Sequence, residues 1–184
     1  MSGTKEQVKV TGVTPSPSGR LRALFSFPNP VNEVSARLVA GGVVLMVVLT
    51  LALGLEWATA VIFYGFVARV LTGPTLSPLG QLVTRVITPR LGVPARPVAG
   101  PPKRFAQAMG VAFSGTALML AVLGYWTAAE VALALLGCAA LLESAFRICL
   151  GCTTFALLMR VGVIPEEVCE RCNDIWATTR GVPA

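Results

Sequence analysis

The sequence predicts an all-α membrane protein whose four transmembrane helices form two hairpins. Three observations support this fold class. The 184 residues are 54% apolar and 13% charged, with a mean hydropathy of +0.73, which is too apolar for a soluble domain. Four apolar runs follow one another, separated by turn-forming or polar segments. All fifteen Lys and Arg residues lie at the same end of these runs.

The N-terminal segment, residues 1–35, is expected to be flexible and cytosolic. It has no sustained hydrophobic period and is rich in Pro, Ser, Lys and Arg. Because so long a polar segment precedes the first apolar run, the pattern does not indicate a cleaved secretory signal.

The membrane domain is predicted to cover residues 36–148. Its first hairpin would use residues 36–55 and 58–71, with Trp57 at interfacial depth between them. Its second hairpin would use residues 105–123 and 128–148.

A cytosolic linker, residues 73–104, is predicted to join the hairpins and to contain an amphipathic helix. Ser77 suits the N-cap of this helix, Pro78 suits its first position, and Pro89 is expected to end it. An equivalent amphipathic segment follows the second hairpin, within the cysteine-rich residues 149–176, and residues 177–184 form a tail. The apolar face of the linker helix comprises Leu79, Leu82, Val83, Val86 and Ile87.

The distribution of charge predicts the orientation. The two turns at the far end carry Glu56 and Glu130 but no Lys or Arg. The positive-inside rule then places both termini and the linker in the cytoplasm, in a multi-pass protein of the cell membrane. The cytosol is reducing, so the cysteines there are not expected to form permanent disulfides.

The two halves also show a similarity that favours an internal duplication. Residues 53–60 parallel 123–130, and residues 68–74 parallel 146–152. Each half would be a hairpin followed by an amphipathic segment, related by an axis along the membrane normal. Chance similarity between apolar segments is an equally good explanation.

Four of the five cysteines fall in one stretch with the spacing C-x2-C-x16-C-x2-C. The first pair could form a thiol redox or sulfur-transfer site, since a helix N-terminus and nearby arginines stabilise thiolate. The four sulfurs could instead hold a structural zinc ion, and an iron–sulfur cluster could use the same ligands. No His follows either pair, which excludes covalent c-type haem. The candidates are Cys149 and Cys152 for redox chemistry, and Cys149, Cys152, Cys169 and Cys172 for metal.

Two charged residues lie near the C-terminal end of the fourth predicted span. Glu143 and Arg147 are four residues apart, so a continuous helix would stack them and allow an intramembrane ion pair. The pair Lys103 and Arg104 and the basic linker are expected to contact anionic lipid headgroups. Nucleic acid is not an expected partner, because no aromatic stacking residues accompany the basic linker.

Several segments resemble a bacterial integral membrane family known as domain of unknown function 4395. The resemblance covers roughly residues 28–176 and includes residues 100–107, 149–160 and 69–74. It implies a small polytopic membrane protein and, through genomic neighbours, a thioredoxin-like or sulfurtransferase partner. It implies no activity.

Two functions therefore stay open. The protein could exchange thiols or sulfur with a soluble thioredoxin-like or sulfurtransferase protein, or it could be a non-catalytic structural or assembly subunit with a four-cysteine zinc site.

Overall fold

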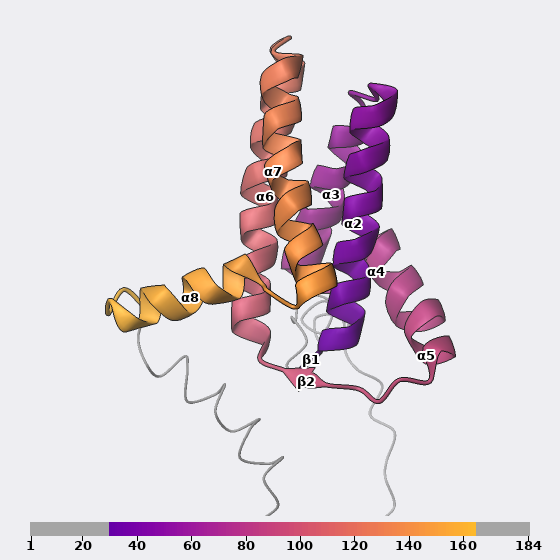
Figure 1. The fold of residues 1–184 in the computed structure, drawn as a ribbon, viewed down its shortest axis with the longest axis vertical. Helices are drawn as coiled ribbons and strands as arrows, with labels where there is room; N and C mark the ends of the chain where they lie inside the picture. Colours follow the sequence, from indigo (N-terminus) through magenta and orange to yellow (C-terminus); the bar gives the residue numbers. More distant parts are fainter. Residues whose placement is uncertain (1–29, 165–184) are drawn as a thin grey trace, which may run out of the picture.

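The computed structural model describes residues 30–164, which are mostly helical (Figure 1). The predicted flexible tail, apart from its last six residues, and the segment after residue 164 lie outside the described residues. The elements in chain order are β1 (Val31–Asn32), α2 (Glu33–Leu53), α3 (Ala58–Thr72), α4 (Pro78–Leu82), the π-helical turn η1 (Val83–Ile87), α5 (Thr88–Leu91), β2 (Pro97–Val98), α6 (Gly100–Val122), α7 (Trp126–Phe146) and α8 (Leu150–Arg160).

The long helices α2, α3, α6 and α7 form an upright bundle (Figure 1). Helix α2 packs chiefly against α7, α3 against α6, and α6 against α7, whereas α2 and α3 share a smaller contact. Small residues allow close approach. A Cβ at Gly110 would lie 2.2 Å from a ring carbon of Phe66. The buried apolar core comprises Val43, Val47, Ile62, Phe66, Ala117, Ala129, Leu133, Leu136 and Ala140.

Three of the described helices, α2, α6 and α7, are long and apolar enough to cross a membrane. This is consistent with a membrane protein. Helix α3 has 15 residues and would rise about 22 Å, less than the hydrocarbon thickness of about 30 Å. The length and composition of the described helices therefore support three spans, and the second predicted span, residues 58–71, corresponds to the shorter helix α3.

The amphipathic segment of the linker is helical and begins as predicted, with the Ser77 hydroxyl accepting a hydrogen bond from the backbone N–H of Gly80. The expectation that Pro89 ends it is wrong. Helix α5 contains Pro89 at its N-terminus and continues to Leu91. The π-helical turn before it shifts the hydrogen-bond ladder, as in the bond from the Thr88 N–H to the Val83 carbonyl. This shift accommodates a residue without an N–H.

The ends of the long helices differ from the predicted boundaries. Helix α2 begins three residues early, at Glu33, because the Asn32 side chain accepts a hydrogen bond from the Val34 N–H and caps it. Strand β1 pairs antiparallel with β2, so the start of α2 is tied to the end of the linker. Helix α6 likewise begins at Gly100, inside the predicted linker.

Candidate functional site

Helix α7 ends abruptly at the foot of the bundle. Arg147 has φ 62°, the left-handed conformation, and its backbone N–H donates to the Leu142 carbonyl. A non-glycine residue in this conformation terminates a helix, so the chain turns sharply. Helix α8 then runs away from the bundle, nearly perpendicular to α7 (Figure 1). Cys149 and Cys152 lie at this corner.

The start of α8 is held against α6 by two contacts. A Cβ at Gly151 would lie 2.4 Å from the Cα of Ala106, so only glycine fits there without movement of the backbone. One turn further, the ring of Phe155 packs on Phe105 with centroids 5.7 Å apart. The glycine inside the first Cys pair therefore fixes the position of both cysteines.

Cys149 is the N-cap of α8. Its Sγ accepts a hydrogen bond from the backbone N–H of Cys152 at 3.4 Å, the place that a Ser or Asp oxygen takes in other helices. Both thiols are free and half-buried. A sulfur at this position is close to the positive end of the helix dipole, which favours the thiolate.

The two thiols are electrostatically unequal. A hydrogen bond from the Cys152 thiol lowers the pKa of Cys149 to about 7, with smaller lowerings from the charge of Lys103 and from the Cys152 backbone N–H, against burial and Glu143, which raise it. The same interaction, with burial, raises the pKa of Cys152. From the sequence we expected nearby arginines to stabilise the thiolate of the first Cys pair. In the structure, Cys152 and Lys103 lower the pKa of Cys149. Cys149 is consequently the better nucleophile of the two.

The ion pair of Glu143 is not the predicted one. Glu143 Oε1 lies 2.5 Å from Nζ of Lys103 on α6, and both side chains are nearly buried, with 11% of Lys103 and 14% of Glu143 exposed. Arg147 is exposed. The predicted Glu143–Arg147 pair required α7 to continue, but the helix ends at Phe146 and the left-handed turn at Arg147 breaks the four-residue stacking.

A second basic residue, Arg69 on α3, is buried within the bundle and only 6% exposed. Its Nε donates to Gln107 Oε1 at 2.8 Å and its Nη1 donates to the Ser77 hydroxyl at 3.2 Å. Its guanidinium also lies 4.4 Å from the centroid of the Phe66 ring. Arg69 thus ties α3 to α6 and to the start of α4.

Arg69, Glu143 and Cys149 line one cavity of about 230 Å³. It lies between α2, α3, α6, α7 and the start of α8. Its wall is mostly apolar. The polar groups that line it are Arg69, Gln107, Glu143 and Cys149, which come from three helices and the corner before α8. An apolar cavity with a few converging polar groups and a reactive residue is the usual form of a small-molecule site.

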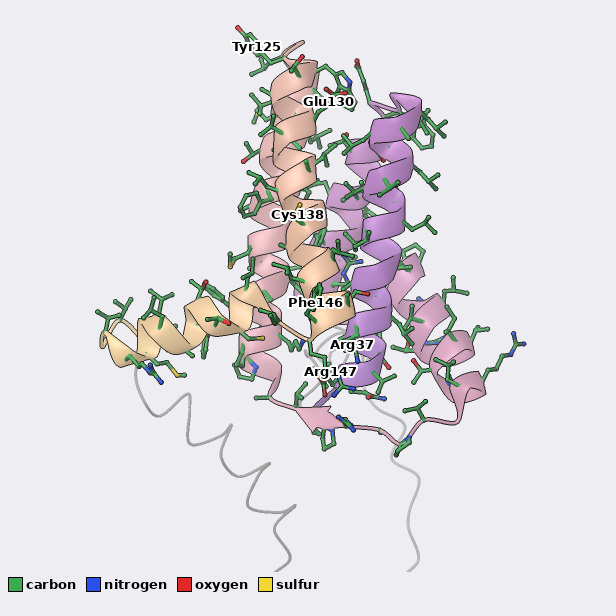
Figure 2. The ribbon with its side chains drawn as sticks, in the orientation of Figure 1. Arg37, Tyr125, Glu130, Cys138, Phe146 and Arg147 are labelled. Atoms are coloured by element: carbon green, nitrogen blue, oxygen red, sulfur yellow. The ribbon has the colours of Figure 1, made fainter. Side chains whose placement is uncertain are left out.

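The remaining predicted site residues are placed as follows. Cys169 and Cys172 lie outside the described residues, so the four-cysteine zinc site and the iron–sulfur alternative stay predictions. Within residues 30–164, no three His, Cys, Asp or Glu side chains gather as a metal site. The fifth cysteine, Cys138, is exposed about halfway along α7 (Figure 2).

The family model described as domain of unknown function (DUF4395) matches residues 31–160. The chain belongs to this family. The match confirms the resemblance seen in the sequence and covers the described bundle from β1 to the end of α8, including Cys149 and Cys152. No curated protein and no solved structure matches the chain. The family description names no activity, so the function of this DUF4395 protein has to be argued from the site.

Sequence reasoning missed Lys103 and Arg69 as members of the site. Lys103 stands beside Arg104 in a basic pair and was assigned to headgroups, and Arg69 was assigned to the flank of a span. The signal that could have revealed Lys103 is Glu143 itself. A carboxylate within an apolar helix needs a cationic partner, and this partner must come from another helix if its own helix ends before a basic residue four positions away.

Proposed function

We propose that this DUF4395 protein is a membrane-embedded dithiol that exchanges electrons or sulfur with a soluble thioredoxin-like or sulfurtransferase protein. The observation that carries the proposal is Cys149 at the N-cap of α8, with Cys152 one turn later as its hydrogen-bond donor. Their pKa values move in opposite directions. This pairing gives one attacking thiolate and one thiol held in reserve.

The reaction would be thiol–disulfide exchange. The Cys149 thiolate attacks one sulfur of a partner disulfide, a mixed disulfide forms, and the other partner sulfur leaves as a thiolate. Cys152 then loses its proton and attacks the Cys149 sulfur of the mixed disulfide. The partner leaves with both of its thiols reduced, and a Cys149–Cys152 disulfide remains. Two electrons pass to the partner, whose two sulfurs take up one proton from Cys152 and one from solvent, and the reverse reaction reduces this protein.

The proposal includes a topology with four membrane crossings and both termini in the cytosol. Helix α3 would be the fourth, short crossing. Arg37 and Arg147 lie at the foot of the bundle, near β1 and β2, whereas Tyr125 and Glu130 lie at the opposite end (Figure 2). This separation supports a cytosolic foot by the positive-inside rule. The cysteine corner would then face soluble cytosolic partners.

The oblique helices α4–α5 and α8 are consistent with this proposed topology. Helix α8 leaves the bundle at its foot and exposes Leu150 and Leu157, while Phe155 is buried. Val161, which directly follows the helix, is also exposed. An apolar exposed face on a helix nearly perpendicular to the spans suits the membrane interface. Each half of the chain thus has two long helices followed by an oblique one, which supports the proposed duplication.

The test is to trap the mixed disulfide in the full-length protein. In a Cys152→Ser variant, the mixed disulfide at Cys149 has no internal thiol to resolve it, so a thioredoxin-like partner should remain attached until reductant is added. Cys149→Ser is the matched control and should trap much less. If neither variant traps a partner, and purified protein carries one zinc per chain with all four paired cysteines protected, the structural zinc subunit replaces this proposal.

A further inference from the structure

A second cavity, of about 300 Å³, lies at the foot of the bundle, and neither Cys149 nor Cys152 lines it. Its walls come from β1, α2, α3, the turn before α4, α4 itself, η1 and α6. This volume is at the lower end of the range for small-molecule sites, so it suits a small ligand. The polar side chains that line it are Asn32, Ser35, Arg69, Thr84, Lys103 and Gln107.

The charge of this lining is positive. Arg69 and Lys103 both contribute to it, and none of the described lining residues is acidic. Glu143 neutralises part of this charge through its 2.5 Å contact with Lys103, but it lines the neighbouring cavity and not this one. Counting these three groups, two cations face one carboxylate, which leaves one positive charge uncompensated next to the cavity.

Arg69 is the cation without a carboxylate partner. The contacts that hold it are to neutral groups, namely Gln107, Ser77 and the ring of Phe66, and the ion pair among residues 30–164 is that of Lys103 with Glu143. Glu143 lines the neighbouring cavity with Arg69 and attracts it through space, but the direct contact of this carboxylate is with Lys103. The cost of burying the guanidinium is therefore only partly offset. The bonds to Gln107 and Ser77 use Nε and Nη1, so Nη2 is not engaged by them.

Neighbouring donors complete the arrangement. Gln107 accepts the Arg69 bond through Oε1, which leaves its amide nitrogen as a donor at the same wall. Arginine, lysine and amide N–H groups are the donors that recognise oxyanions, and a planar guanidinium suits two oxygens of one group.

From this geometry we propose that the cavity between Arg69, Lys103 and Gln107 binds a small oxyanion, namely a phosphate or sulfate group. The group could be a free anion or the phosphate of a lipid headgroup, because both present the same oxygens to the same donors. The inference is independent of the thiol function, since Cys149 and Cys152 do not line this cavity.

The experiment uses the full-length protein in nanodiscs of zwitterionic lipid and follows thermal unfolding by tryptophan fluorescence. Sodium sulfate and sodium phosphate are titrated at constant ionic strength against sodium chloride. We expect a saturable rise in the midpoint temperature with sulfate or phosphate. General salting-out by these anions also stabilises proteins, but it does not saturate and does not depend on one arginine.

Arg69→Gln should weaken the anion affinity by about tenfold to a hundredfold, the loss of a charge-assisted hydrogen bond. Arg85→Gln is the matched control, because Arg85 is exposed on η1 and does not line the cavity. If Arg69→Gln does not fold, the double variant Lys103→Gln/Glu143→Gln replaces it. That variant removes the second cation with its carboxylate partner and should also weaken binding.

Nanodiscs with anionic phospholipid distinguish the two sources. If anionic lipid stabilises the wild type but not Arg69→Gln, and free sulfate adds nothing, the ligand is a headgroup phosphate. If free anions act in zwitterionic discs, the ligand is a soluble oxyanion. The proposal is overturned if neither source gives a saturable effect, or if the effect is equal in the wild type and the cavity variants.

Discussion

The Lys103–Glu143 ion pair offers a sharp test of the packing at the foot of the bundle. Both side chains are nearly buried and joined at 2.5 Å, so replacing one of them leaves a charge in an apolar environment. Removing one partner of a buried pair costs about 3–5 kcal/mol. Since 11% and 14% of the side chains remain exposed, we expect the lower end, about 3 kcal/mol, for Lys103→Met or Glu143→Leu.

The assay is thermal unfolding of the purified protein in one detergent. For a chain of this size, about 3 kcal/mol corresponds to a fall of about 6–12 °C in Tm. The double variant Lys103→Met/Glu143→Leu removes both charges and should recover most of the loss, because an apolar pair of similar volume is nearly neutral. The two single effects should therefore be strongly non-additive.

Arg147→Asn is the control for this cycle. Arg147 is exposed, and Asn tolerates the left-handed conformation that ends α7, so its effect should stay within about 0.5 kcal/mol. The reasoning is refuted if the two single variants add in the double variant. It is equally refuted if Arg147→Asn destabilises as much as Lys103→Met, since Glu143 would then depend on Arg147.

Three further predictions concern the thiol corner, the helix packing and the topology. Cys152→Ala should raise the pKa of Cys149 above about 7 towards its ordinary value of 9.0, so iodoacetamide labelling of Cys149 should begin at higher pH. An unchanged labelling profile would contradict the claim that the Cys152 side chain lowers the pKa of Cys149. Gly151→Ala should displace α8 from Ala106 and change the Cys149 profile, whereas the exposed Leu157→Ala should not; equal profiles would show that α8 is not anchored there. A reporter active only outside the cytosol should be silent when fused after Ala184 and active when inserted at Gly124; the reverse pattern would contradict the topology.

The sequence was informative where the signal is local and repetitive. The long helices, the Ser77 cap and the amphipathic linker helix follow from hydrophobic runs and capping residues close together in the chain. The pair of strands β1 and β2 could not be found in this way, because two residues per strand carry no period and their pairing joins segments far apart.

The charged groups of the site show why the rest could not be predicted. Spacing along one helix can suggest only a local partner, so Glu143 was matched with Arg147, four residues away. Its real partner, Lys103, lies on another helix and reaches it because α6 begins at Gly100, which makes Lys103 part of a packed helix instead of a linker. Similarly, Arg69 ends the apolar run of α3 and reads as a flanking charge, although the start of α4 folds back and buries it.

The central claim is that Cys149 and Cys152 form an asymmetric dithiol, and isotope-coded alkylation of the reduced, full-length protein across pH tests it most directly. Peptide mapping reports the labelling of each cysteine separately. The account predicts that Cys149 labels with a midpoint near pH 7, well below that of Cys152, without any chelator. It is contradicted if Cys149 and Cys152 label together at the same pH, or if both stay protected, together with Cys169 and Cys172, until a chelator removes a bound metal.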